Sequence, residues 1–124
     1  MADTSAIFAA MQPILAQYSP PFHTRIQSPH AIDLWAEGDF DVMGQTRKEM
    51  FFASAIIMSD YVGLYYMPIY ADVESIKKTI PPRLLAMLKG KACFHIREWD
   101  NALAEEVKIA LKNGFAIYKA RGWV

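Results

Sequence analysis

Two runs of β-forming residues joined by a short polar link are the strongest pattern in the chain. Residues 48–58 and 61–67 are both rich in aromatic and aliphatic side chains, and only a Ser-Asp pair separates them, which is a length that β-hairpins use. Pro68 ends the second run, because a proline nitrogen has no hydrogen to donate to a neighbouring strand. We therefore predict that residues 50–70 form a buried β-hairpin.

Alternation of apolar and polar residues predicts further strands before and after this hairpin. In residues 31–42 every second side chain is apolar as far as Gly38, where we expect a turn, and residues 43–46 supply a second turn. Residues 91–98 also alternate, which places Cys93 and His95 on one face of a last strand and Phe94 on the other.

Apolar residues spaced three and four positions apart predict helices at both ends of the chain. The first covers residues 4–17, capped by Thr4 or Ser5, and it is either kinked at Pro13 or divided there into two pieces. The last begins after Asp100 as its cap, with a break expected at Gly114. Prolines make residues 18–30 an extended connection, and a helical pair is predicted over residues 72–79 and 81–90.

These elements predict one α+β domain over residues 1–124, with residues 1–30 as its N-terminal helix and Pro-rich connection. The sheet is expected to be a single antiparallel layer of about five strands. Helices lie at both termini, a helical pair precedes the last strand, and the helices cover mainly one face. The predicted core consists of Phe52, Ile56, Val62, Leu64, Phe94, Ile96, Leu103 and Val107.

Composition narrows the class of protein. Of 124 residues, 53% are hydrophobic and 21% charged, which is ordinary for a globular domain. Thirteen basic residues balance thirteen acidic ones, which argues against nucleic acid or an anionic membrane as the partner. Cys93 is the only cysteine, so no internal disulfide and no Cys-rich zinc site can form. No signal-peptide pattern or membrane-spanning apolar run is present, and a cytoplasmic protein is expected.

Three groups of residues are candidates for chemistry, while the usual nucleotide, zinc and serine-hydrolase motifs are absent. Cys93 and His95 share a strand face and are suited to a thiolate pair or to a soft metal, although a buried cysteine more often acts as a small hydrophobic residue. A second group is acidic and suits a hard cation such as iron, unless it only protects an edge strand. It consists of Asp33, Glu37, Asp39 and Asp41.

The third group is a set of amphipathic aromatic residues around the end of the hairpin. Tyrosine and tryptophan keep one polar end, so a cluster of them suits a binding surface, and it equally suits cross-strand packing. The predicted ligand-binding positions are Trp35, Tyr65, Tyr66, Met67 and Tyr70, together with Cys93 and His95. If the helices leave this face open, it also favours a homodimer.

Three segments of the chain carry a family resemblance, and they are MFFASAIIMSDYVGLYYMPIY, IPPRLLAMLKGKACFHIREWD and the closing GFAIYKARGWV. In this order they resemble the YdhG-like family, whose members are domains of unknown function. The resemblance covers residues 32–124. It implies a compact α+β fold with an antiparallel sheet, found mainly in bacteria. One branch is described as frataxin-like, delivering iron for iron-sulfur cluster assembly through surface carboxylates, which here implies the acidic group above.

The leading functional hypothesis is a non-enzymatic binding domain that engages a small molecule or a protein partner on its tyrosine-rich face beside Trp35. An iron-binding chaperone of the frataxin-like type is the alternative. An enzyme using Cys93 and His95 is a third hypothesis.

Overall fold

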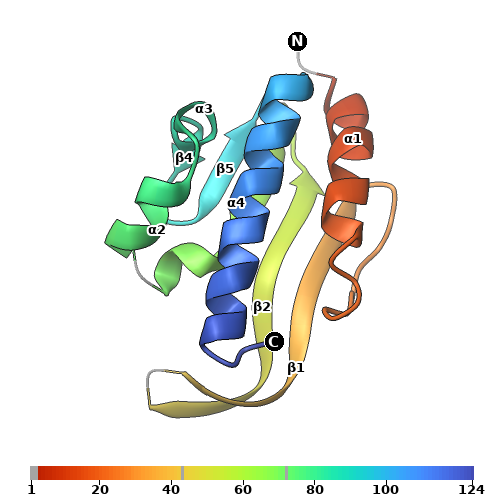
Figure 1. Cartoon of the computed structure of the whole chain (residues 1–124). Helices are drawn as coiled ribbons and strands as arrows, with labels where there is room; N and C mark the ends of the chain where they lie inside the picture. Colours follow the sequence, from red (N-terminus) through yellow and green to blue (C-terminus); the bar gives the residue numbers. More distant parts are fainter. Residues whose placement is uncertain (1–2, 43, 72) are drawn as a thin grey trace.

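The computed structural model describes residues 3–42, 44–71 and 73–124. Figure 1 shows its helices and strands along the chain. In chain order they are α1 (Thr4–Ala16), β1 (Ala31–Val42), β2 (Gln45–Ile57), β3 (Val62–Tyr66), the short 3-10 helix η1 (Met67–Tyr70), α2 (Val73–Thr79), α3 (Pro82–Leu85), β4 (Leu88–Lys89), β5 (Cys93–Ile96) and α4 (Asn101–Ala120).

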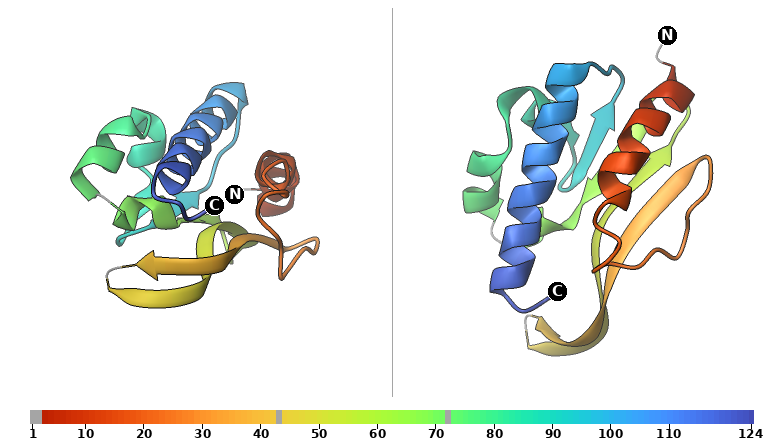
Figure 2. Two further views of the ribbon diagram at one scale, coloured as in Figure 1. Left: turned by 60° about the horizontal axis from the view of Figure 1, so that its bottom comes forward. Right: turned by 45° about the vertical axis from the view of Figure 1, so that its right-hand side comes forward.

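The described strands form one antiparallel sheet in the order β1-β2-β3-β5-β4. Figures 1 and 2 show the helices gathered on one face of this sheet, with α1 and α4 lying across it. The predicted α+β class is therefore confirmed, including the helices at both termini and the helical pair before the last strand, β5. Among the described residues no helix is long and apolar enough to cross a membrane.

Strand register decides which side chains face the helices. Ile32, Ala55, Leu64 and Phe94 are neighbours across four strands, and all four are fully buried. The alternate row consists of Ala31, Ile56, Gly63 and His95 on the opposite face. Ile56 is therefore half-buried, which corrects its predicted place in the core, whereas the other seven predicted core residues are buried as expected.

The hairpin prediction is confirmed, with boundaries that differ by a few residues. Strand β3 ends at Tyr66, and η1 begins immediately with a proline in its first turn. The turn predicted at Gly38 is wrong, because β1 continues through Gly38 with a register shift between Glu37 and Phe40. The Phe40 ring packs against Gly38, where a Cβ atom would lie 3.1 Å from the ring. Met43 of the second predicted turn lies outside the described residues.

The helix boundaries also correct the predictions. Helix α1 is continuous through Pro13, and its N-cap is Asp3, whose carboxylate accepts a hydrogen bond from the Ala6 backbone at 3.0 Å. Helix α3 ends at Leu85 and not near Gly90, because the chain then pairs with β5 as strand β4. Helix α4 runs through Gly114 without a break. Asp72, the predicted start of α2, lies outside the described residues.

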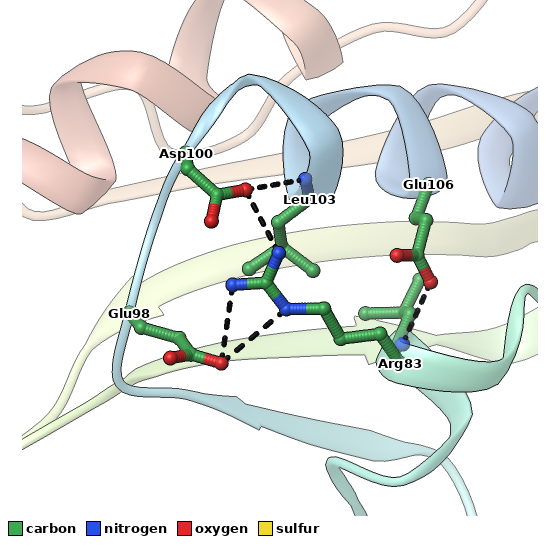
Figure 3. A network of polar contacts seen from close by, with 6 residues as sticks. Arg83, Glu98, Asp100, Leu103 and Glu106 are labelled. Carbon is green, nitrogen blue, oxygen red and sulfur yellow. Dashed lines mark hydrogen bonds and ion pairs between the residues drawn. The ribbon is translucent and has the colours of Figure 1, made fainter.

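A polar network connects α3 with the start of α4 (Figure 3). The Arg83 guanidinium donates to Asp100 at 2.8 Å and lies 3.2 Å from a Glu98 oxygen. Asp100 also accepts the Leu103 backbone N–H at 2.8 Å, which confirms it as the N-cap of α4. The hydrogen bond from Arg83, followed by the one from Leu103, lowers the pKa of Asp100, so this cap remains ionised at neutral pH.

Candidate functional site

The face of the sheet opposite the helices carries Trp35, Tyr65, Cys93 and His95 of the predicted ligand-binding positions. Register places Asp33, Ser54, Tyr65 and Cys93 in one row across β1, β2, β3 and β5. In the next row Trp35 and Phe51 are paired, and their ring centroids lie 5.1 Å apart. We call this surface the open face. It combines ring edges and faces with a hydroxyl and a thiol, which is the composition of a binding surface for a flat apolar group.

A hollow of about 280 Å³ lies where β3 passes into η1. Tyr65 and Tyr70 are 37% and 48% exposed, so their rings are accessible from solvent. The hollow brings together four of the seven predicted ligand-binding residues. It is lined by Phe51, Tyr65, Tyr66, Met67, Tyr70 and Ala92.

Helix η1 is held in place by contacts on its buried side. Pro68 and Ile69 are buried, and Pro68 packs close to Gly114 of α4. Tyr66 borders the hollow, but its side chain is fully buried and its hydroxyl donates to the Ala110 carbonyl of α4. Burial raises the pKa of Tyr66, so the phenol stays protonated. Tyr66 therefore helps to hold η1 against α4, whereas the rings of Tyr65 and Tyr70 are exposed.

Trp35 is positioned by residues 23–27, which we call the strap. The strap pairs with the outer edge of β1 through two bridges, and one of these joins His23 to Trp35 with backbone bonds of 2.7 and 2.9 Å. The Arg25 guanidinium lies 3.8 Å from the centre of the Trp35 ring. Trp35 is consequently half-buried, and it packs against Phe51, which lines the hollow, while Trp35 is not among the lining residues.

Asp33 organises the strap. One of its carboxylate oxygens accepts the backbone N–H groups of Arg25 and Ile26, at 2.7 and 3.0 Å. The other oxygen accepts the Trp35 indole N–H at 2.9 Å. Both oxygens are therefore engaged in hydrogen bonds within the fold, and the metal-binding role of this carboxylate stays a prediction.

Cys93 and His95 both lie on the open face, as predicted, and within the described residues no hydrogen bond joins their side chains. Burial raises the pKa of the Cys93 thiol, which favours the protonated form at neutral pH and weakens it as a nucleophile. The His95 ring stacks on Tyr61, with centroids 4.0 Å apart, and lines a separate hollow beside Arg97. The geometry thus gives little support to an enzyme using these two residues.

The four predicted metal-binding carboxylates are not brought together. Asp39 pairs with Lys48, and Asp41 lines another hollow with Arg47. Glu37 instead lies directly opposite Glu49 across β1 and β2.

A group of three metal-ligating side chains forms around Glu37. His23 of the strap lies 3.4 Å from it, and ligand atoms of His23, Glu37 and Glu49 all lie within 4.8 Å of one another. Within the described part of the chain this is the group whose geometry suits a metal ion. Arg25 also pairs with Glu49 and would compete with a cation there. Sequence reasoning missed His23 and Glu49, because the pairing of the strap with β1 brings His23 to Glu37 and the pairing of β2 with β1 brings Glu49 there.

Comparison of the chain with protein-family models, curated proteins and solved structures finds no match. Function is therefore inferred from the side chains and their arrangement in the described residues.

Proposed function

We propose that this protein is a non-enzymatic binding domain that accepts an apolar, ring-bearing group on its open face. The observation that supports this most directly is the hollow beside η1, lined by Phe51, Tyr65, Met67 and Tyr70. Phe51 and Tyr65 of this lining belong to the face of the sheet that the helices, as Figure 2 shows, leave uncovered. The chemistry is that of stacking and apolar contact, with phenol hydroxyls available at the rim.

Size limits what this hollow can hold. At about 280 Å³ it lies just below the range of pockets for drug-sized ligands, so it fits a small molecule of one or two rings. A single aromatic side chain of a protein partner has the same dimensions and chemistry. Either ligand would contact Tyr65 and Tyr70, whose exposed rings lose the most water on binding.

Titration with indole, followed by NMR, tests the proposed site. We expect saturable shifts of the backbone amides of Tyr65, Met67 and Tyr70. Tyr65→Ser should weaken indole binding about tenfold, because it removes one stacking wall and its apolar area. Ile109→Ser is the matched control, since Ile109 is 45% exposed on α4, away from the hollow.

Two outcomes would contradict the proposal. Shifts that never saturate would show only general contact with apolar surface, and equal binding by Tyr65→Ser would place the site elsewhere. Sedimentation equilibrium at the same protein concentration checks whether a homodimer covers the open face, which is the other way to bury such a surface.

We also propose that the chain is a cytoplasmic member of the YdhG-like family. The α+β class and the antiparallel sheet support the family membership, because they agree with the compact fold that the resemblance implies.

Iron binding is the second candidate function, favoured by His23, Glu37 and Glu49. Imidazole and carboxylate groups are ligands that ferrous iron accepts. In addition, two glutamates directly opposite each other on neighbouring strands repel, so a cation between them would relieve an unfavourable pair. In a frataxin-like role, iron would be cargo and its weak, exposed binding would suit transfer to another protein.

Anaerobic calorimetric titration with Fe²⁺ tests this second candidate. Glu37→Gln with Glu49→Gln should weaken Fe²⁺ binding by at least about tenfold. Loss of a direct metal ligand lowers metal affinity at least as much as loss of a residue that only hydrogen-bonds to a ligand. Asp39→Asn with Asp41→Asn removes the same charge and should leave binding unchanged. If the control pair weakens binding as much as the first pair, iron is only attracted by general negative charge. If neither pair has an effect, the site is wrong.

A further inference from the structure

A second and larger hollow, of about 400 Å³, lies on the other side of Met67 and Tyr70. It is bounded by the far part of the β1–β2 hairpin, by η1 and by the chain that follows α4. Figure 1 shows the C-terminus near this part of the hairpin. One wall is apolar and largely aromatic, and it consists of Met50, Met67, Tyr70 and Trp123. The other wall carries charged groups.

The C-terminal turn fixes the aromatic wall. Gly122 adopts a φ of +74°, a conformation that glycine accepts without strain, and this turns the chain back after α4. The Trp123 backbone N–H then donates to the Tyr118 carbonyl at 2.8 Å. The indole packs edge-on against the Tyr118 ring, with centroids 5.2 Å apart, and is only 9% exposed. The backbone hydrogen bond and the packing on Tyr118 therefore fix Trp123 as one wall of the hollow.

Two guanidinium groups supply the charge. Arg121 lies 5.3 Å from the Trp123 ring centre and donates to the Ala71 carbonyl at 3.1 Å, which holds it beside the hollow while leaving its remaining N–H groups available. Arg47 lies on the hairpin side, and within the described residues it forms neither an ion pair nor a side-chain hydrogen bond. Asp41 is the one carboxylate among the lining residues, so the lining charge is net positive.

We infer that this hollow binds a small organic anion in which a carboxylate or a phosphate is attached to an aromatic ring. Guanidinium groups recognise both acids through paired hydrogen bonds, and an aromatic ring in the hollow would contact Tyr70 and Trp123, which both line it. Asp41 then accepts from an N–H or O–H group of the ligand and orients it. This inference does not depend on the open-face hollow, because Phe51 and Tyr65 contribute nothing to the lining here.

Titration of the whole chain with phenylacetate, phenyl phosphate and phenylacetamide, followed by NMR, tests the inference. The chain has three tryptophans, so three indole N–H signals can be assigned by Trp→Phe variants. We expect saturable movement of the Trp123 signal with at least one of the two anions. The neutral amide, which has almost the same shape, should bind at least about tenfold more weakly, because it cannot form charge-assisted hydrogen bonds. The anion that binds more tightly shows whether the site prefers a carboxylate or a phosphate.

Substitutions of the two arginines test whether their positive charge is needed for anion binding. Arg47→Gln and Arg121→Gln should each weaken binding of the tighter anion about tenfold, and both side chains are exposed, so the fold should persist. Arg97→Gln removes an exposed arginine beside Tyr61 and serves as the control. Tyr65→Ser should leave anion binding unchanged, which separates this site from the open-face hollow. Equal affinity for acid and amide, an unchanged affinity in both arginine variants, or movement of the Trp35 or Trp99 signal instead would overturn the inference.

Discussion

Replacing Gly114 with alanine is expected to destabilise the protein by about 2 kcal/mol, although alanine is the better helix former by about 1 kcal/mol. Gly114 is buried in α4, and a Cβ atom there would lie 2.6 Å from the Tyr66 hydroxyl and 2.7 Å from a Pro68 ring carbon. Neither neighbour can move away easily, because the Tyr66 hydroxyl donates to the Ala110 carbonyl and Pro68 is buried in the first turn of η1. The clash must therefore separate α4 from the end of β3.

Urea denaturation measures this cost. Lys112→Ala, an exposed change on the same helix, is the control and should stay within about 0.5 kcal/mol of the wild type. The cost of Gly114→Ala should be smaller in a Tyr66→Phe background, because that change removes the atom nearest to the new methyl group. A Gly114→Ala protein as stable as the wild type would mean that α4 is not packed tightly against η1.

Gly114 is also an example of a feature that the sequence alone predicted wrongly. Its low helix propensity predicted a break in α4, but the tertiary contact with Tyr66 and Pro68 needs a residue without a side chain in the middle of a continuous helix. By contrast, the cap at Asp100 and the end of β3 shortly before Pro68 were predictable, because each follows from the chemistry of one residue and its sequence neighbours.

The candidate sites also divide into one that could be predicted from neighbouring residues in the sequence and one that could not. Tyr65, Met67 and Tyr70 were found from the sequence because they are near one another along the chain, and they do line one hollow. The larger hollow was missed, because Arg47 and Trp123 are brought together only by the packing of the C-terminal turn on the β1–β2 hairpin. Alternation placed Trp35 on the correct face, yet its partner Arg25 belongs to a connection without any periodic pattern.

Replacing Asp33 with alanine is expected to cost about 2 kcal/mol of stability and to release the strap from β1. The change removes the acceptor for the Arg25 and Ile26 backbone N–H groups and for the Trp35 indole, and a hydrogen bond to a charged group contributes about 1.5–3 kcal/mol. The two backbone donors lie near solvent, so water molecules can accept their hydrogen bonds in the variant. The expected loss of unfolding free energy is therefore close to the contribution of one such hydrogen bond.

Hydrogen exchange and urea denaturation together separate this role from metal binding. Asp33→Ala should speed exchange of the Arg25 and Ile26 amides, and the loss of stability should be the same with or without EDTA. Asp39→Asn is the control, since Asp39 makes only an exposed pair with Lys48 and should change stability by less than about 0.5 kcal/mol. Stability that EDTA lowers in the wild type but not in Asp33→Ala would show that the carboxylate acts through a bound metal. If EDTA changes nothing and the strap amides exchange faster, Asp33 fixes the strap, and with it the positions of His23, Arg25 and Trp35.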